Sequence, residues 1–156
     1  MKNNEKIKIM FICQGNICRS PMAMFILRDK IQKLGLGDKY EVISAALESS
    51  TSGEDMYRES KKMLDENNIP YTKHTAHKIT LGEYLSMDYI LVMEKYQKIE
   101  IKRFVSDSNF SKVHCLSEYS DEEDIQDPYY TRDFEKAYKD ICLGIDGFLT
   151  KIILHK

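Results

Sequence analysis

The chain has 156 residues, enough for one domain with a single hydrophobic core and too few for two domains of ordinary size. Its net charge of -2 at pH 7 gives no basic surface for nucleic acid, and no apolar run is long enough to cross a bilayer. The apolar stretch 7–13 is too short for a signal-peptide core, and 4 cysteines are too few for a disulfide scaffold. We therefore expect a single domain over 1–156, located in the cytoplasm, with neither nucleic acid nor a membrane as a partner.

Apolar strand patterns alternate with helix patterns along the chain. The first strand ends at a glycine-containing turn, and Pro21 stands near the start of the first helix, where proline is favoured. We predict strands over 7–12, 40–46, 88–93 and 112–116. We predict helices over 22–34, 54–68, 95–104 and 131–153, and a polar, acidic loop over 117–127.

This alternation is typical of a parallel sheet that helices cover on both faces. We expect a single-domain, three-layer α/β fold that is flavodoxin-like, with a central four-stranded parallel sheet in the order 2-1-3-4. In such sheets, ligands bind beyond the carboxyl ends of the strands, at the point where the strand order reverses. The loop after the first strand is therefore the first place to look for chemistry.

That loop places Cys13 and Arg19 between a strand and the start of a helix. Gly15 permits a tight turn, and successive backbone N–H groups of such a loop can converge on an anion. The helix N-terminus adds its positive dipole end, and the planar guanidinium of Arg19 can bind two phosphate oxygens. The same groups favour the thiolate form of Cys13, whose sulfur would be a nucleophile facing a bound phosphorus atom. The loop therefore predicts a phosphate cradle. Its other members are Gln14, Asn16, Ile17, Cys18 and Ser20.

A carboxylic acid beside the phosphate would protonate the departing oxygen and then act as base for the attacking water. Asp127 is the candidate, because it stands in a loop just before the last predicted helix. Tyr129 and Tyr130 follow it, either as a wall for a phenyl ring or as anchors of that helix. The residues alone leave the other carboxylates of this loop open as acids. These are Asp121, Glu122, Glu123 and Asp124.

The low-molecular-weight protein tyrosine phosphatases have a signature that resembles Cys13-x-Gly15-Asn16-Ile17-Cys18-Arg19-Ser20-Pro21. The resemblance continues, in the same order along the chain, through Ser44-Ala45, His74 and Asp127-Pro128-Tyr129-Tyr130. It implies an enzyme that hydrolyses phosphotyrosine and aryl phosphates through a phosphocysteine on Cys13. Arg19 would bind the phosphate, Asp127 would be the general acid and base, and inorganic phosphate would be released. No cofactor is implied.

The same resemblance implies supporting roles for further residues. Ile17, Tyr129 and Tyr130 would line the crevice that receives the substrate ring, and Ser20 would stabilise the cysteine sulfur as a leaving group. A polar network under the loop would hold the loop amides in place. This network would consist of Asn16, Ser20, Ser44 and His74.

The remaining cysteines and histidines carry weaker signals. The family pattern implies a reversible disulfide between Cys18 and Cys13 that shelters the nucleophile, and a small buried residue at Cys18 is the open alternative. Cys115 and Cys142 stand in strand and helix patterns and are expected in the core. Neither the cysteine spacing nor the pair His74-x-x-His77 matches a metal-ligand framework, so no metal site is expected.

Three positions depart from the family pattern. Gln14 replaces a commonly apolar residue close to the substrate ring, Ser50 stands where an aromatic side chain often overhangs the crevice, and Met24 replaces a commonly acidic residue. The first two departures leave the substrate preference open.

Three alternative functions share parts of this signature. Arsenate reductases share the fold but relay a disulfide through further cysteines, and none stands between Cys18 and Cys115 here. Protein arginine phosphatases of the same family tend to carry Thr at the position of Ile17, so Ile17 favours phosphotyrosine. A phosphotyrosine-binding module with a dead site is disfavoured because the nucleophile, the arginine and the acid are all present.

Overall fold

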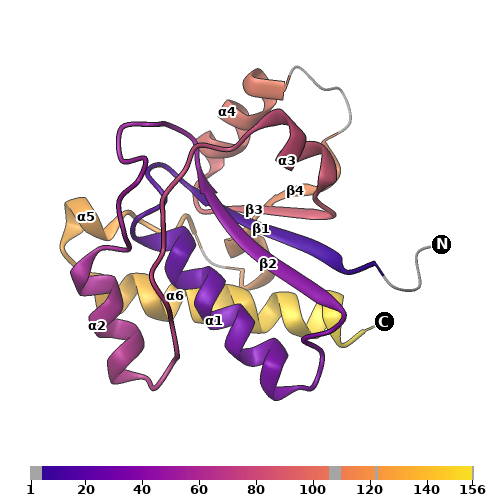
Figure 1. Cartoon of the computed structure of the whole chain (residues 1–156), viewed down its shortest axis with the longest axis horizontal. Coiled ribbons are helices and arrows are strands. Elements are labelled where there is room, and N and C mark those ends of the chain that lie inside the picture. Colours follow the sequence, from indigo (N-terminus) through magenta and orange to yellow (C-terminus); the bar gives the residue numbers. More distant parts are fainter. Residues whose placement is uncertain (1–4, 106–109, 122, 156) are drawn as a thin grey trace.

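The computed structural model describes residues 5–105, 110–121 and 123–155. Strands and helices alternate in it broadly as predicted (Figure 1). The strands are β1 (Ile7–Cys13), β2 (Tyr40–Ala46), β3 (Tyr89–Val92) and β4 (Val113–Cys115). The α-helices are α1 (Arg19–Lys33), α2 (Arg58–Glu66), α3 (Leu81–Ser86), α4 (Lys95–Val105), α5 (Pro128–Thr131) and α6 (Phe134–Phe148). A 3₁₀ turn, η1 (Leu116–Tyr119), follows β4, and a π-helical turn, η2 (Leu149–Ile153), extends α6.

The four strands form one parallel sheet in the order β2-β1-β3-β4, which confirms the expected order. Phe11 in the middle of β1 stands opposite Ser44 of β2 on one side and Leu91 of β3 on the other. β2 thus lies on one side of β1, whereas β3 and β4 extend the sheet on its other side. The strand order therefore reverses beside β1, whose carboxyl end is the expected place for a ligand.

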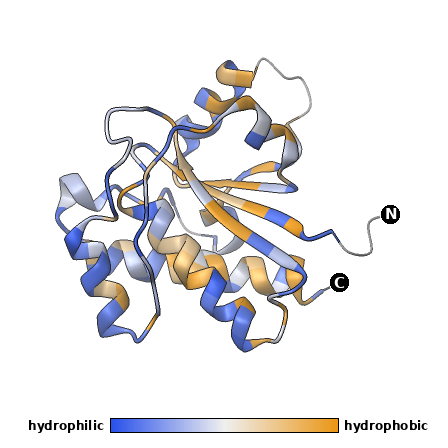
Figure 2. Ribbon diagram, in the orientation of Figure 1, coloured by the Kyte–Doolittle hydropathy of each residue, from blue (hydrophilic) through white to orange (hydrophobic). Residues whose placement is uncertain are grey.

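Each face of the sheet has its own apolar core, because successive residues of a strand point to opposite faces. Ile9 and Phe11 pack in the cluster that α1 and α6 cover, whereas Met10 and Ile12 pack in the cluster with residues of α3 and α4. Figure 1 shows these layers, and Figure 2 shows that the strands between them are largely apolar. Helices on both faces are therefore confirmed. Within the described residues, no helix is both long enough and apolar enough to cross a membrane.

The first helix begins earlier than predicted, at Arg19 instead of Met22. Cys18 is its N-cap residue, so Arg19 and Ser20 belong to the first helical turn. Pro21 fits inside this turn because the first N–H groups of a helix have no intrahelical partner. The loop before the helix turns through Asn16, whose φ of 59° is in the left-handed region that asparagine adopts more readily than most residues.

The second helix is shorter than predicted, because α2 begins only after Tyr57. The residues before it form hydrogen bonds with other segments instead of a helical turn. The Ala76 amide donates to the Glu54 carbonyl at 2.8 Å, and the Tyr57 amide donates to the Ile17 carbonyl at 2.7 Å. These bonds hold the segment beside the loop after β1, so that Tyr57 becomes part of the cleft described below.

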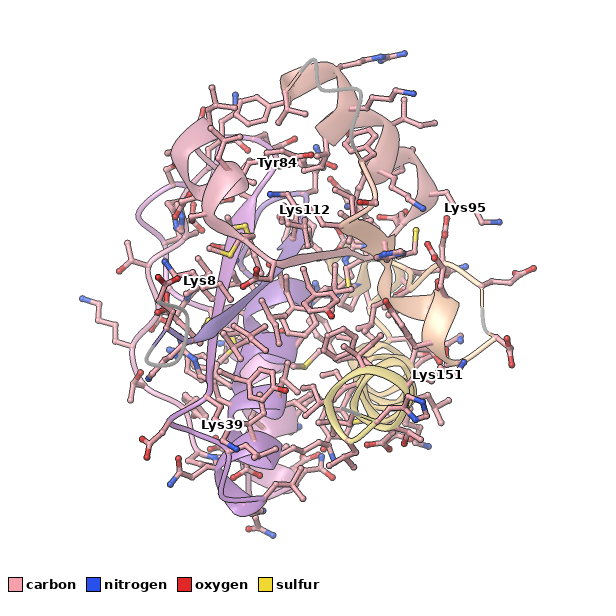
Figure 3. All side chains as sticks on the ribbon, turned by 90° about the vertical axis from the view of Figure 1, so that its right-hand side faces the viewer. Lys8, Lys39, Tyr84, Lys95, Lys112 and Lys151 are labelled. Carbon is pink, nitrogen blue, oxygen red and sulfur yellow. The ribbon has the colours of Figure 1, made fainter. Side chains whose placement is uncertain are left out.

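Helix α3 was missed by the sequence prediction, although its start is marked by a capping box. The Thr80 hydroxyl accepts a hydrogen bond from the Glu83 amide, and the Glu83 carboxylate accepts one from the Thr80 amide. The other end of the helix is fixed by Lys112, whose ammonium group lies 4.4 Å from the centre of the Tyr84 ring and donates to the Met87 carbonyl at 3.1 Å (Figure 3). Such a short helix depends on these contacts more than on its own propensity.

The last predicted helix, over 131–153, corresponds to α6 and η2 and begins later than predicted, at Phe134. A separate short helix, α5, precedes it and was not predicted. Asp127 caps α5, a proline stands at its first helical position, and its C-cap is Arg132, whose φ is 62°. The side chain of Asp133 then caps α6. The two tyrosines that follow Asp127 therefore lie on α5.

Candidate active site

A cleft of about 320 Å³ opens at the carboxyl end of β1. The loop after β1 contributes Cys13, Gln14, Gly15, Ile17 and Cys18 to its walls. The segment between β2 and α2 contributes Glu48, Ser50, Thr51, Glu54 and Tyr57. The segment around α5 contributes Asp127, Tyr129 and Tyr130. The cleft therefore joins the candidate nucleophile, the candidate acid and the two candidate tyrosines.

The sulfur of Cys13 lies at the base of the cleft, and the residue is 3% exposed. The Ser20 hydroxyl lies 3.0 Å from this sulfur, and the Ser20 amide donates to it at 3.4 Å. Both donors come from the first turn of α1, where the helix dipole also favours negative charge. Ser20 thus contacts the sulfur through both its hydroxyl and its amide.

Asn16 connects the loop to its support. Its side-chain amide donates to the Ser20 hydroxyl at 2.7 Å and to the Ser44 hydroxyl at 2.9 Å, and all three residues are buried. Its carbonyl oxygen lies 2.9 Å from Nε2 of His74. The four residues that the resemblance assigned to a polar network are therefore in direct contact.

A second segment holds the loop from the opposite side. The Thr51 hydroxyl donates to the Gly15 carbonyl at 2.6 Å, and a Cβ at Gly15 would come within 2.9 Å of the same hydroxyl. The Ile17 carbonyl accepts a hydrogen bond from the backbone amide of Tyr57. Both bonds are accepted by loop carbonyls, so they hold the loop without using its amide groups.

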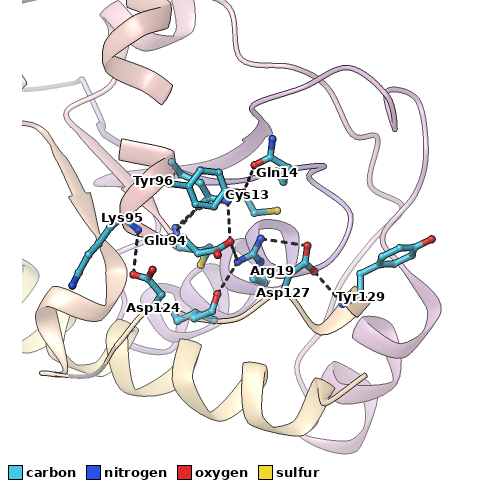
Figure 4. Close-up of polar contacts among 12 residues, drawn as sticks. Cys13, Gln14, Arg19, Glu94, Lys95, Tyr96, Asp124, Asp127 and Tyr129 are labelled. Carbon is cyan, nitrogen blue, oxygen red and sulfur yellow. Dashed lines mark hydrogen bonds and ion pairs between the residues drawn. The ribbon is translucent and has the colours of Figure 1, made fainter. Parts of the chain in front are cut away.

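Arg19 is the most deeply buried charged residue of the site, with 1% of its side chain exposed. Its NH1 group donates to Glu94 at 2.6 Å and to the Ile125 carbonyl at 2.7 Å, and its NH2 group lies 3.5 Å from Oδ2 of Asp127 (Figure 4). Burial alone would lower the pKa of Arg19, but the nearby Cys13, Asp127 and Glu94 together raise it. The guanidinium is therefore a fixed positive charge.

One donor of this guanidinium is unused. The Nε of Arg19 is buried and has no hydrogen-bond partner within the part of the chain that the structure describes. A buried donor without a partner is costly, and an acceptor such as a phosphate oxygen would remove that cost.

Asp127 lines the cleft and forms an ion pair with the buried Arg19. Its Oδ1 accepts from the Tyr129 amide at 3.0 Å, which is the N-cap bond of α5, and its Oδ2 is the oxygen near Arg19. The hydrogen bond and the ion pair together hold the carboxylate at the edge of the cleft, where 23% of the side chain is exposed. Of the alternative acids, Asp124 instead accepts from the Lys95 amide at 3.1 Å, and Glu122 lies outside the described residues.

Three tyrosine rings form the apolar part of the cleft. Tyr129 meets Tyr57 edge to face at 5.7 Å and Tyr130 edge to face at 5.3 Å. Tyr57 is in turn stacked on Phe134 of α6 at 5.7 Å. Tyr130 is 79% exposed, so it forms the outer rim. Tyr57 connects the three tyrosines to α6 through its contact with Phe134.

The sequence profile described as low molecular weight phosphotyrosine protein phosphatase matches residues 8–155. The chain belongs to this phosphatase family. The YfkJ low molecular weight protein-tyrosine-phosphatase of Bacillus subtilis is 32% identical over 153 residues, covering 96% of this chain and 98% of its own. A low molecular weight phosphotyrosine protein phosphatase 2 of Drosophila melanogaster is 29% identical over 161 residues, covering 99% of this chain and 98% of its own.

Solved structures agree with this membership. The crystal structure of YfkJ from Bacillus subtilis matches the phosphatase with a TM-score of 0.94 at 30% identity, over 99% of each chain. The crystal structure of a drosophila arginine phosphatase matches with a TM-score of 0.85 at 29% identity, over 92% of this chain and 96% of that one. The fold is therefore shared by phosphatases named for two different substrates.

All four cysteines of the phosphatase are free in the structure. Burial, followed by the charges of Cys13 and Asp127, raises the pKa of Cys18 to about 12, so that this thiol stays protonated at neutral pH. Cys115 is buried as predicted, whereas Cys142 is only partly buried and packs against the edge of the core. No group of three or more His, Cys, Asp or Glu side chains is arranged to hold a metal within the described ranges.

Glu94 and Tyr57 are among the residues of the site that the sequence analysis missed. Glu94, which binds Arg19, stands shortly after β3, so the rule that ligands bind at the carboxyl ends of parallel strands could have found it. Tyr57 was placed inside a helix that begins too early, and nothing in the local pattern indicates its contact with Ile17. The contact comes from chain segments that are distant in sequence.

We expect the phosphatase to lose stability in acid through His74. Burial lowers the pKa of this imidazole below 6.5, against the opposing effects of the Asn16 carbonyl and Asp55. The unfolded chain takes up a proton on His74 near its ordinary pKa, at a pH where the folded protein does not. The contribution of neutral His74 to the free energy of unfolding is therefore fully present above about pH 6.5. It is lost as the pH falls through the lowered pKa.

Thermal unfolding of His74→Gln from about pH 7.5 to 5 measures this effect. The variant should be less stable than the wild type at neutral pH and should show a smaller loss of Tm on acidification. The exposed His155 supplies the control, and His155→Gln should retain the wild-type profile. A His74→Gln profile parallel to that of the wild type would contradict the assignment.

Proposed function

We propose that this chain is a protein tyrosine phosphatase that hydrolyses phosphotyrosine through a phosphocysteine on Cys13, with Asp127 as general acid and base. One observation carries the proposal. The Cys13 sulfur accepts from Ser20 at the base of a cleft, beside a buried Arg19 whose Nε has no partner in the described chain. A dianionic phosphate group would satisfy this donor and bring its phosphorus to the sulfur.

In the first step, the Cys13 thiolate attacks phosphorus and forms a sulfur–phosphorus bond while the bond from phosphorus to the phenolic oxygen breaks. Arg19 and the loop amides stabilise the charge of the transferring group. Glu94 and the Ile125 carbonyl support this step by fixing the guanidinium. Asp127 gives its proton to the departing phenolic oxygen.

In the second step, Asp127 accepts a proton from a water molecule that attacks the phosphocysteine. The sulfur–phosphorus bond breaks, inorganic phosphate leaves, and the thiolate of Cys13 is restored. The Ser20 hydroxyl, 3.0 Å from the sulfur, stabilises the thiolate as it departs. Asp127 thus loses one proton in the first step and regains one in the second.

The aromatic wall supports a phenyl phosphate as substrate. Tyr129 and Tyr130 offer aromatic rings near Asp127, and Ile17 offers an apolar side chain from the loop that follows Cys13. Tyr57 also lines the cleft and supplies a further aromatic side chain, in contact with Tyr129. A phosphotyrosine side chain of a protein would therefore pack between apolar surfaces, with its phosphate at Arg19.

A cytoplasmic location is part of the proposal, because the mechanism needs a reduced sulfur at Cys13. Four free cysteines without a disulfide framework fit a reducing compartment. The Cys18 thiol beside the nucleophile, whose pKa is raised to about 12, would form a protective disulfide only after Cys13 itself is oxidised.

Phosphoarginine is the second candidate substrate, because a solved arginine phosphatase shares the fold. Hydrolysis rates on two peptides of one sequence, carrying either phosphotyrosine or phosphoarginine, separate the candidates. We expect faster phosphotyrosine turnover that is absent in Cys13→Ser. Faster phosphoarginine turnover would overturn the interpretation of Ile17, and no Cys13-dependent turnover on either peptide would overturn the proposed function.

A further inference from the structure

A hydrogen-bonded chain of side chains crosses one side of the cleft mouth. The Tyr96 hydroxyl of α4 donates to Oε1 of Gln14 at 2.6 Å, as Figure 4 shows, and Nε2 of Gln14 donates to Glu48 at 2.7 Å. The Ser50 hydroxyl donates to the other carboxylate oxygen of Glu48, also at 2.7 Å. Gln14, next to the nucleophile in sequence, thus holds a carboxylate at the rim.

This carboxylate is charged. The hydrogen bonds from Ser50 and from Gln14 lower the pKa of Glu48, against a small opposing effect of burial. Both oxygens of the exposed side chain accept hydrogen bonds, which favour one position of the charge on the rim. A charge that is already positioned loses little rotamer freedom when it forms an ion pair.

The other charges that line the cleft have the same sign. Besides Glu48, the lining contains Glu54 and Asp127, and no lysine or arginine is among the described residues that form it. Beyond the tyrosines, the guanidinium of Arg132 is paired with Glu59 at 3.3 Å and lies over the Tyr57 ring. A substrate residue beside the phosphotyrosine therefore meets negative charge at the rim.

We propose that Glu48 is a specificity-determining residue that selects phosphotyrosine substrates carrying a lysine or arginine next to the phosphotyrosine. The inference rests on the proposed function and names the substrate class of the same site. The phosphate is recognised at the base of the cleft by Arg19 and the loop amides. The flanking residue is recognised at the mouth, by the carboxylate that Gln14 and Ser50 hold.

The charge on Glu48 acts on flanking residues of either sign. A cationic residue gains a partly exposed ion pair, whereas an anionic residue is repelled by Glu48 and Glu54. Adding both effects, we expect kcat/KM to differ by about tenfold between a cationic and an anionic peptide at low salt. Because the pair is exposed, added salt should reduce the difference.

The first test uses the wild-type enzyme and two phosphotyrosine peptides of one sequence. One has lysine on both sides of the phosphotyrosine, and the other has glutamate. The ratio of their kcat/KM values is measured at low salt and at about 1 M NaCl, where the Debye length falls to about 3 Å. We expect a ratio near ten that falls toward one in high salt.

The second test assigns the preference to Glu48. In Glu48→Gln the ratio should fall toward one, and in Glu48→Lys it should invert in favour of the glutamate peptide. The ratio cancels any general loss of rate, so that a change common to both peptides is not counted. Glu66→Gln is the matched control, because Glu66 is an exposed carboxylate at the end of α2 that does not line the cleft, and its ratio should equal that of the wild type.

A third variant tests the hydrogen-bonded chain. Gln14→Leu removes the bonds to Glu48 and Tyr96 but leaves the charge of Glu48 in place, so the ratio should fall only part of the way. Equal rates of the wild type on both peptides, or an unchanged ratio in Glu48→Lys, would overturn this inference alone. Hydrolysis of neither peptide would instead overturn the proposed function on which it rests.

Discussion

Turnover of phosphotyrosine is expected to fall by roughly 10⁴-fold or more in Cys13→Ser, because a serine hydroxyl is not ionised where the thiolate would be. Serine has nearly the size of cysteine, so the contacts with the Ser20 hydroxyl and amide can remain. Initial rates on a phosphotyrosine peptide measure the loss. Binding of inorganic phosphate, measured by calorimetry, should stay close to that of the wild type, because Arg19 and the loop amides are unchanged.

Cys142→Ser is the control for this variant, since Cys142 lies on α6 outside the cleft and is only partly buried. It should retain full activity. A Cys13→Ser enzyme that binds phosphate and still turns over substrate would contradict the assignment of the nucleophile. Loss of phosphate binding together with activity would instead indicate a collapsed loop, which the melting temperature would also report.

Asp127→Asn is expected to slow hydrolysis of phenyl phosphate by roughly 10²–10⁴-fold, the range typical of lost acid–base assistance. Asparagine keeps an oxygen that can accept from the Tyr129 amide, so α5 retains its cap. The variant therefore removes the proton and little of the structure. Steady-state rates across the pH range measure the effect.

The leaving group separates the role of Asp127 from a structural one. A nitrophenol departs readily without a proton, so the first step of nitrophenyl phosphate hydrolysis should be slowed less than that of phenyl phosphate. Glu123→Gln, an exposed carboxylate of the same loop, should be silent with both substrates. Full activity of Asp127→Asn at every pH would mean that another carboxylate is the acid.

The strand pattern predicts the fold well because its signals are local. The apolar run of β1 and the alternation of strands and helices predict a parallel sheet, and the structure has it in the expected order. The residues of the loop after β1 are also close in sequence, so the sequence alone predicts that Cys13, Asn16 and Arg19 belong to one phosphate-binding loop.

The parts that could not be predicted depend on contacts between distant segments. Residues 54–57 read as the first turn of a helix, yet they bond to Ile17 and Ala76 instead, and tertiary contacts override the local pattern. The rim formed by Gln14, Glu48 and Tyr96 joins three separate segments. The sequence shows that Gln14 departs from the family pattern. It does not show that Gln14 forms hydrogen bonds with Glu48 and Tyr96.

The central claim is that phosphate passes through Cys13, and a trapping experiment tests it most directly. Asp127→Asn is mixed with nitrophenyl phosphate, whose departure needs little acid, so the phosphoenzyme should form faster than water removes it. Quenching, digestion and mass spectrometry then locate the phosphate. We predict phosphate on the peptide that contains Cys13, and none on that peptide in Cys13→Ser. Phosphate on another residue, or an unmodified Cys13 during continued turnover, would contradict the account.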